Sequence, residues 1–206
     1  MLEESNALLI SCDGSSLVID TLCKQAVEEN AAVACFYFDF ATHEEQSLAA
    51  ILGSVLKQVV GGLKEVPERI VKAFRDREKV IGGQSLELAE IVEFLHDISS
   101  DRRTFICIDA LDECPPGHLV KILDSLNQIL QESAGAWLFL TGRPHIRGRV
   151  EKHLAGRVAT RSITPTKNDL TIFLRAKLKE DTILDAMDES LEEEIIKNVP
   201  ETIPEM

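Results

Sequence analysis

The chain has 206 residues and is 45% hydrophobic, so it is long enough for one sizeable core, with or without an appended helical piece. Its 35 acidic residues outnumber its 22 basic residues and give a formal net charge of −13. This charge argues against a nucleic-acid or anionic-membrane surface, because a polyanion does not attract an acidic chain. One local region is basic and could still attract a small anion; it contains Arg143, Arg147, Arg149, Lys152, Arg157 and Arg161.

The N-terminal sequence, MLEESNALLIS, lacks the positively charged start and the long apolar segment of a signal peptide. No apolar run approaches the ~18 residues that a membrane-spanning helix needs. The five cysteines form neither a CxxC pair nor another metal-binding spacing, so reduced thiols are expected. These features predict a cytoplasmic protein.

Short apolar runs alternate with longer segments of helical periodicity, which is typical of a parallel β-sheet covered by helices. The runs are continuously rather than alternately apolar, as in strands that are buried on both faces. We therefore predict five strands, at residues 7–11, 32–38, 104–109, 136–141 and 157–163.

Between the second and third strands, apolar residues recur every three or four residues in three segments, which predicts three helices. Pro67 is expected at the first position of the second helix and Ser85 at the N-cap of the third. The apolar positions are predicted to face the core. They are Leu48, Leu52, Val55, Val59, Ile70, Val71, Phe74, Leu88, Ile91, Val92, Leu95 and Ile98.

A further helix is predicted after the third strand, from the apolar positions between Leu119 and Leu130. The tail from Asn168 onward is more acidic and more helical than the rest of the chain. Helices are predicted there over residues 168–179, which begin with capping residues, and over 188–198. This tail is expected to be the start of a small helical subdomain.

The stretch TFICIDALDEC, residues 104–114, is an apolar strand followed by acidic residues. Such a strand places Asp109 at the carboxyl edge of the sheet, where open α/β sheets bind ligands. In a phosphoryl-transfer site this aspartate holds the magnesium ion that bridges the β and γ phosphates, usually through water. Asp112 and Glu113 could orient an attacking water or the waters of the metal. The small Ala110 would leave room for metal and phosphates.

The alternative interpretation of the same acidic residues is a solvated turn between a strand and a helix. Acidic side chains are favourable just before a helix N-terminus, which carries a partial positive charge. The sequence of this segment leaves both interpretations open.

Arg143 follows the next predicted strand, in AWLFLTGRPH, and therefore lies at the same edge of the sheet. Its guanidinium could bind a γ phosphate through two hydrogen bonds and so sense its presence. The equally supported alternative is a salt bridge with Asp109 or Asp112.

The phosphate-binding loop that these residues need has the pattern G-x-x-x-x-G-K-[ST], in which backbone amides and the lysine hold the phosphates. After the first predicted strand the chain instead reads CDGSS, with Ser15 in the place of the lysine, and the loop is several residues too short. Because Ser15 cannot supply the lysine's charge, we expect triphosphate affinity to be low or absent.

Four motifs, FYFDF at residues 36–40, FICIDALDEC, LFLTGRPH and ITPTKNDLTIFL, occur in this order along the chain. With them the chain resembles the NACHT-type nucleoside triphosphatase domain of fungal NLR-like signalling proteins, including their nephrocystin-3-like N-terminal group. The resemblance covers about residues 7–179.

The resemblance implies an α/β fold of the P-loop NTPase type, a three-layer sandwich with a five-stranded, mostly parallel sheet in the order 5-1-4-3-2 and a C-terminal helical extension. It implies a NACHT-like nucleotide-binding domain over residues 1–165 and the start of a helical subdomain over 166–206. In the family this domain lies between an effector and a repeat region, so protein partners are expected through oligomerisation or through those regions. The chain is expected to be a fragment, a divergent copy or a mispredicted gene product of such a protein.

Residue roles implied by the resemblance follow the motif positions. The implied metal residues are Asp109 and Ser16, the residues that support hydrolysis are Asp112 and Glu113, and the nucleotide-binding residues are Gly14, Ser15, Ser16 and Arg143. The implied ligands are Mg²⁺ and ATP or GTP.

Two functions stay open at this point. The first is a signalling switch of the STAND class that binds ATP or GTP weakly and hydrolyses it slowly if at all, since the lysine is missing. The second is a degenerate NACHT fold that serves as a non-catalytic assembly module. Another type of enzyme has little support, because the histidines and cysteines show no catalytic or metal-ligand spacing.

Overall fold

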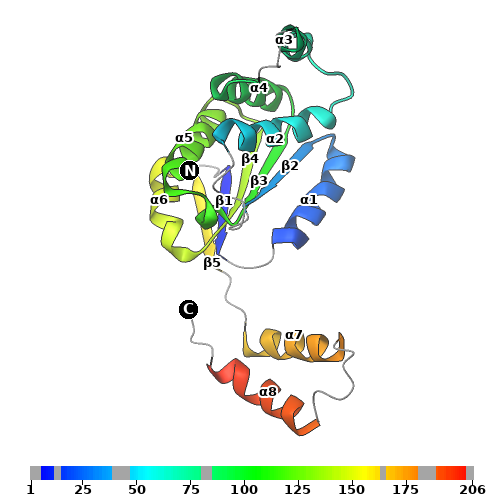
Figure 1. Cartoon of the computed structure of the whole chain (residues 1–206), viewed down its shortest axis with the longest axis vertical. Coiled ribbons are helices and arrows are strands. Elements are labelled where there is room, and N and C mark those ends of the chain that lie inside the picture. The colour runs from blue at the N-terminus through cyan, green and yellow to red at the C-terminus, as the bar shows by residue number, and fades with distance from the viewer. Residues whose placement is uncertain are drawn as a thin grey trace. The chain divides into compact units, whose positions relative to one another are not determined.

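The computed structural model describes residues 6–11, 15–38, 47–79, 85–162, 166–180 and 189–202. The chain divides into two compact units, Met1–Ser162 and Ile163–Met206. The first unit contains the β-sheet and helices α1 to α6, and the second contains helices α7 and α8 (Figure 1).

A five-stranded sheet in the order β2-β3-β4-β1-β5 forms the centre of the first unit, and every neighbouring pair of strands is parallel. The predicted fold class and the predicted strand order are therefore confirmed. The predicted strand positions agree to within one residue at each end. The strands are β1 (Ala7–Ser11), β2 (Ala32–Tyr37), β3 (Thr104–Asp109), β4 (Ala136–Thr141) and β5 (Val158–Ser162).

Helices cover both faces of this sheet, which makes three layers (Figure 1). The larger core lies between the sheet and α2, α4, α5 and α6, and the smaller core lies between the sheet and α1. Alternate residues of β3 face the two cores: Ile106 and Ile108 belong to the larger one and Cys107 to the smaller. The helices are α1 (Ser15–Glu29), α2 (Leu48–Gly61), α3 (Glu68–Glu78), α4 (Leu88–Asp101), α5 (Pro116–Glu132) and α6 (Arg147–His153).

The predicted start of α4 was wrong. The helix begins at Leu88 with Glu87 as its N-cap, so Ser85 lies before the cap. The carboxylate of Glu90 fixes this start, because it accepts a hydrogen bond from the backbone N–H of Glu87 at 3.0 Å and forms an ion pair with Arg77 of α3.

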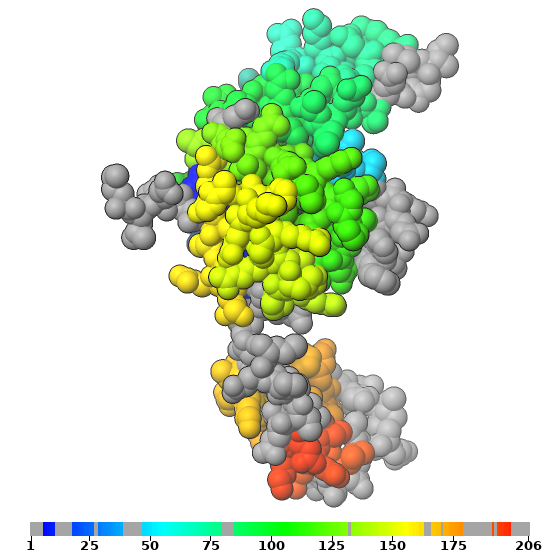
Figure 2. All heavy atoms as spheres, turned by 90° about the vertical axis from the view of Figure 1, so that its left-hand side faces the viewer, coloured from blue at the N-terminus to red at the C-terminus, as the bar shows by residue number. Residues whose placement is uncertain are grey.

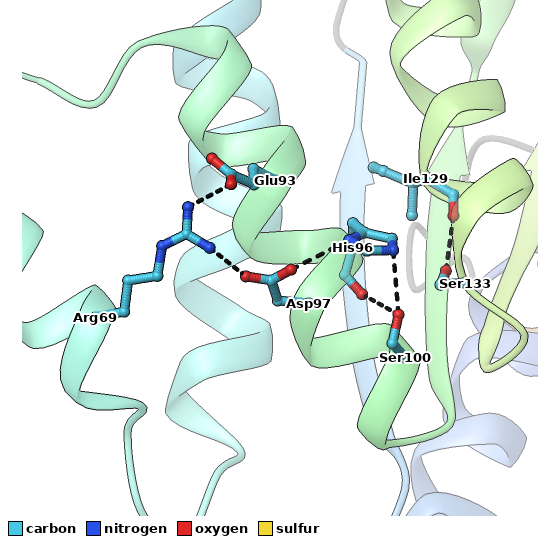
Figure 3. A network of polar contacts seen from close by, with 7 residues as sticks. All are labelled: Arg69, Glu93, His96, Asp97, Ser100, Ile129 and Ser133. Atoms are coloured by element: carbon cyan, nitrogen blue, oxygen red, sulfur yellow. Dashed lines mark hydrogen bonds and ion pairs between the residues drawn. The ribbon is translucent and has the colours of Figure 1, made fainter.

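Helix α3 lies outside α4 and contacts the core along a narrow strip. It begins at Glu68, so Pro67 is its N-cap rather than its first helical residue. Ile70 is buried, but Phe74, predicted to face the core, is 49% exposed. Polar contacts complete the attachment: Arg69 forms ion pairs with Glu93 and with Asp97 of α4, the latter at 2.7 Å (Figure 3).

The guanidinium of Arg69 also lies over the ring of Phe94, 5.4 Å from its centroid. A cation over an aromatic face is attracted by the negative charge of the π system. The outer helix α3 is thus held to α4 by charged as well as apolar contacts, which explains why one buried isoleucine suffices on its inner side.

In the second unit, α7 (Lys167–Glu180) and α8 (Glu189–Thr202) contact each other. The start of α7 is capped by Thr166, whose Oγ1 accepts a hydrogen bond from the backbone N–H of Asp169 at 3.2 Å. In return, the Asp169 carboxylate accepts one from the backbone N–H of Thr166 at 2.8 Å. The helix therefore starts one residue before the predicted position. No helix in the described part of the chain combines the length and the apolar character needed to cross a bilayer.

Candidate functional site

The carboxyl edge of the sheet brings together residues from four strands. Strand register places Ile10 of β1 beside Thr141 of β4, and Tyr37 of β2 beside Asp109 of β3. Since Ile108 pairs with Leu140, the next residues, Asp109 and Thr141, are also neighbours. These strand ends therefore form one row across the sheet, next to the side on which α1 begins.

Thr141 connects this row through its hydroxyl group. Its Oγ1 donates a hydrogen bond to Oδ1 of Asp109 and accepts one from the backbone N–H of Ala110 at 3.0 Å. Thr141 is 2% exposed and its two partners are partly buried, so both bonds are partly shielded from water. The sequence reasoning missed Thr141. The signal that could have found it is a hydroxyl residue at the end of an otherwise apolar strand beside the aspartate strand.

Ala110 turns the chain sharply after β3. It has φ 52° and ψ 45°, in the left-handed region, which residues other than glycine seldom adopt. The hydrogen bond from its N–H to Thr141 supports this conformation, and the fully buried Leu111 follows at the start of the 3₁₀ turn η2 (Leu111–Glu113). A small side chain is favoured here by the backbone conformation as well as by the predicted need for space.

Asp112 joins the loop after β3 to the loop after β4. Its side chain is only 7% exposed, and its Oδ1 accepts a hydrogen bond from the backbone N–H of Arg143 at 3.1 Å. Its Oδ2 lies 3.4 Å from Nε of Arg143. Gly142 makes this approach possible, because a Cβ there would lie 2.6 Å from Cδ1 of Ile146 and 3.2 Å from Oδ1 of Asp112.

Arg143 thus takes part in the ion pair that was one of its two predicted roles, and its partner is Asp112. Its side chain is nevertheless 75% exposed. A guanidinium has five N–H donors, so the contact with Asp112 leaves donors for a second anion. Its predicted role in binding a γ phosphate stays a prediction.

The structure describes the remaining predicted site residues in part. Glu113 ends η2 and is half-buried. Ser15 and Ser16 form the first turn of α1 in the backbone. Their side chains, and the whole of Gly14, lie outside the described residues.

The basic region predicted from the sequence lies partly on α6. Arg147, Arg149 and Lys152 of this helix are exposed, as is Arg161 of β5. Figure 2 shows the face that α6 and β5 form, in yellow. Glu151 neutralises part of it, because its carboxylate accepts hydrogen bonds from Arg147 at 2.7 Å and from the Thr160 hydroxyl of β5 at 3.1 Å.

The donor set at the sheet edge fits a magnesium ion that arrives with a nucleotide. Within the described ranges, no three His, Cys, Asp or Glu side chains are grouped so that they could hold a metal ion by themselves. Magnesium commonly takes only one or two protein carboxylates together with phosphate oxygens and water, and Asp109 meets that requirement. Ser15, in contrast, does not supply the charge that a triphosphate needs.

Three solved structures with the same fold give the context of this site. The first is Cdc6p from Pyrobaculum aerophilum, with a TM-score of 0.51 and 14% identity; the match covers 92% of this chain and 47% of that one. The second is the Aeropyrum pernix ORC1 protein in complex with DNA, with a TM-score of 0.54 and 20% identity; the match covers 88% of this chain and 46% of that one. The third is a chain of Drosophila ORC bound to AT-rich DNA and Cdc6, with a TM-score of 0.50 and 10% identity; the match covers 96% of this chain and 70% of that one. At these identities the likeness shows a shared fold, that of P-loop NTPases. The chain spans about half the length of the first two.

No curated protein matches the chain in sequence. A family model does: the one described as "Nephrocystin 3, N-terminal" matches residues 10–143, which is more than half of the 206 residues. The matched segment begins in β1 and ends at Arg143, so it includes the whole row of strand ends at the sheet edge. The chain therefore belongs to the nephrocystin 3, N-terminal family.

Proposed function

We propose that this chain is a nucleotide-binding switch domain of the NACHT type that binds Mg-ATP or Mg-GTP weakly. The observation that carries the proposal is the contact between Thr141 and Asp109 at the carboxyl edge of the sheet. It holds a carboxylate at the end of β3, on the side where α1 begins. A helix N-terminus and a carboxylate that can hold magnesium are two of the components that bind a triphosphate in a fold of this type, beside the loop and lysine that this chain lacks.

Asp109 is the residue proposed to hold magnesium. A carboxylate has about four lone-pair sites, so the bond to Thr141 leaves capacity for the waters of a metal ion. Bound magnesium would neutralise charge on the β and γ phosphates. Thr141 fixes the orientation of the carboxylate through the one bond and the turn at Ala110 through the other.

The affinity is proposed to be weak because Ser15 replaces the lysine. Loss of a charge-assisted hydrogen bond costs about 2–3 kcal/mol, which corresponds to roughly a 30- to 150-fold loss of affinity. Hydrolysis is proposed to be slow as well. Asp112 and Glu113 are the carboxylates that we assign to supporting hydrolysis, and Asp112 also contacts Arg143.

The second candidate function is a degenerate NACHT fold that acts as an assembly module without nucleotide. Ser15 in the lysine position favours it. In either case, protein partners are proposed to bind through oligomerisation or through effector and repeat regions of a longer protein. Two of the similar structures contain DNA, but the net charge of −13 argues against DNA as a partner of this chain. We also propose a cytoplasmic location, without membrane attachment.

Titration of the chain with fluorescent analogues of ATP and GTP in magnesium tests the choice between the two functions. The proposed switch shows weak binding that Asp109→Ala abolishes and that Ser15→Lys strengthens. Asp76→Ala serves as the charge-matched control, because Asp76 lies on α3 and pairs with Lys79 at 2.9 Å. Absence of binding in both the unmodified chain and Ser15→Lys would refute the switch. Binding that is lost in Asp109→Ala but kept in the control would refute the degenerate module.

A further inference from the structure

Two cysteines lie side by side on neighbouring strands of the sheet. Cys35 of β2 and Cys107 of β3 are register partners in a parallel pair, so their side chains leave the same face of the sheet. Adjacent strands are about 4.7–4.9 Å apart, within the range of about 4.4–6.8 Å that disulfides span between Cα atoms. Both thiols are free in this structure.

The environment of the pair makes Cys35 the accessible member. Cys107 is fully buried in the small core under α1, together with Ile10, Ile19 and Phe139. Cys35 is only partly buried at the border of the same core, because β2 is the edge strand of the sheet. An oxidant in solution therefore reaches Cys35 before Cys107.

The backbone of Cys35 is held in place from the outer side. Gln58 of α2 binds it like an additional strand: its Oε1 accepts a hydrogen bond from the N–H of Cys35 at 2.9 Å, and its Nε2 donates one to the Cys35 carbonyl at 2.8 Å. The edge strand is thus fixed at the residue whose thiol faces Cys107. This fixation keeps the two sulfur atoms together and favours reaction between them over reaction with distant thiols.

The neighbouring thiol also affects the acidity of Cys35. The Cys107 thiol, as a hydrogen-bond donor toward Cys35, lowers the pKa of Cys35. The other described cysteines lack this advantage. Burial, followed by the negative groups of Cys35 and Asp20, raises the pKa of Cys23, and burial raises the pKa of Cys114 to about 12. Because the thiolate is the nucleophile, the hydrogen bond supports Cys35 as the first thiol to react.

We propose that Cys35 and Cys107 form a redox-active dithiol that hydrogen peroxide or an organic hydroperoxide converts to a disulfide. The sulfur of Cys35 attacks the peroxide, breaks its O–O bond and becomes a sulfenic acid, while the other oxygen leaves as water or alcohol. The sulfur of Cys107 then attacks the sulfenic sulfur, and the hydroxyl leaves with the Cys107 proton as water. The two thiols lose two electrons in total, and the peroxide gains them.

The disulfide would join β2 covalently to β3 two residues before Tyr37 and Asp109. The register places these two residues side by side at the end of the same two strands. Oxidation therefore acts on the strand pair that carries the proposed magnesium carboxylate. The dithiol itself does not depend on nucleotide binding.

Peptide mass spectrometry after graded peroxide treatment of the full chain tests the proposal. Tryptic cleavage separates the cysteines: residues 1–24 contain Cys12 and Cys23, residues 25–57 contain Cys35, and residues 104–121 contain Cys107 and Cys114. Cys114→Ser as the background variant makes the third peptide report Cys107 alone. The expected product is a crosslink between peptides 25–57 and 104–121, with equal loss of the two thiols.

Single substitutions in this background assign the steps. Cys107→Ser is expected to abolish the crosslink and to leave a sulfenic acid at Cys35 that dimedone traps. Cys35→Ser is expected to abolish both products, and Cys23→Ser is expected to change neither. A crosslink of Cys35 to Cys23 or Cys12, or faster dimedone labelling of Cys23 than of Cys35, would overturn the proposal. Circular dichroism of each variant confirms that it is folded before the peroxide is added.

Discussion

Thr141 at the end of β4 donates a hydrogen bond to the Asp109 carboxylate at the end of β3, and both residues are the last of their strands. The same hydroxyl accepts the N–H of Ala110 at 3.0 Å. One buried side chain therefore sets both the direction of the proposed magnesium carboxylate and the turn that follows it. The contact joins two neighbouring strands, and its two residues are 32 positions apart in the sequence.

Thr141→Val tests this contact by removing the hydroxyl and keeping the shape of the side chain. The N–H of Ala110 and Oδ1 of Asp109, which are part-buried, then lose a shared partner. We expect the free energy of unfolding to fall by about 1–3 kcal/mol, the net contribution of two hydrogen bonds, one of them to a carboxylate. Urea denaturation measures it. Thr141→Ser retains the hydroxyl and should recover most of the loss; a valine variant as stable as the unmodified chain would contradict the assigned role.

Asp112 and Arg143 should contribute unequally to stability, although they form one ion pair. The Asp112 side chain is nearly buried and accepts the backbone N–H of Arg143, whereas the Arg143 side chain is largely exposed. Asp112→Ala is expected to cost about 1–3 kcal/mol, because it leaves that N–H without its acceptor. Arg143→Ala is expected to cost under about 1 kcal/mol, the value of an exposed ion pair. Equal losses in urea denaturation would show that the side-chain pair dominates.

The strands of the sheet could be predicted from the sequence because each one is indicated by an apolar pattern within its own few residues. Residues 105–108 are continuously apolar and Asp109 follows them, and that pattern alone indicates a strand that is buried on both faces and ends at a polar edge. Asp109 could be placed at the edge for the same reason. The order of the strands came from the family resemblance and not from the pattern.

Features that depend on contacts between distant elements could not be predicted. The role of Thr141 follows from the pairing of β3 with β4, and the residue pattern within either strand does not predict that pairing. Residue type alone favours Ser85 as the cap, but the start of α4 is set by Glu90, which forms an ion pair with Arg77 of α3. Phe74 fits the apolar spacing of α3, but this helix packs on the outside of α4, so it buries Ile70 and leaves Phe74, one turn further on, exposed.

Gly135, in the turn between α5 and β4, should not tolerate a side chain. A Cβ there would lie 2.3 Å from the carbonyl oxygen of Ser99 and 2.9 Å from that of Arg102, and backbone atoms cannot move aside as a side-chain end can. We expect Gly135→Ala to lower the free energy of unfolding by about 1–3 kcal/mol or more. Gly148→Ala is the matched control, because nothing lies within 4 Å of its added Cβ in α6.

The control should change stability in the opposite direction. Alanine is favoured over glycine inside a helix by about 0.5–1 kcal/mol, so Gly148→Ala is expected to be neutral or more stable than the unmodified chain. Thermal unfolding of both variants under one condition gives the comparison. Gly135→Ala with an unchanged melting temperature would mean that the turn between α5 and β4 rearranges without cost.

Glu90 should make the stability of the chain depend on pH. Its pKa lies below the ordinary value of 4.5, first because its carboxylate accepts the N–H of Glu87 and then because Arg77 donates to it. A pKa that is lower in the folded state means that the charged form stabilises the fold. This contribution is fully present above about pH 4.5 and is lost as the pH falls through the lower, folded pKa.

Glu90→Gln should remove that part of the pH dependence, because glutamine keeps an acceptor for the Glu87 N–H but does not titrate. At neutral pH, the Glu90→Gln variant is expected to have a lower free energy of unfolding than the unmodified chain. Between about pH 5 and pH 3, the free energy of unfolding of this variant is expected to fall less than that of the unmodified chain. Arg77→Gln distinguishes the two causes. Since the Glu87 contact remains, this variant should retain part of the acid-dependent loss. Urea denaturation at each pH measures all three proteins, and an Arg77→Gln curve as flat as that of Glu90→Gln would assign the effect to the ion pair instead.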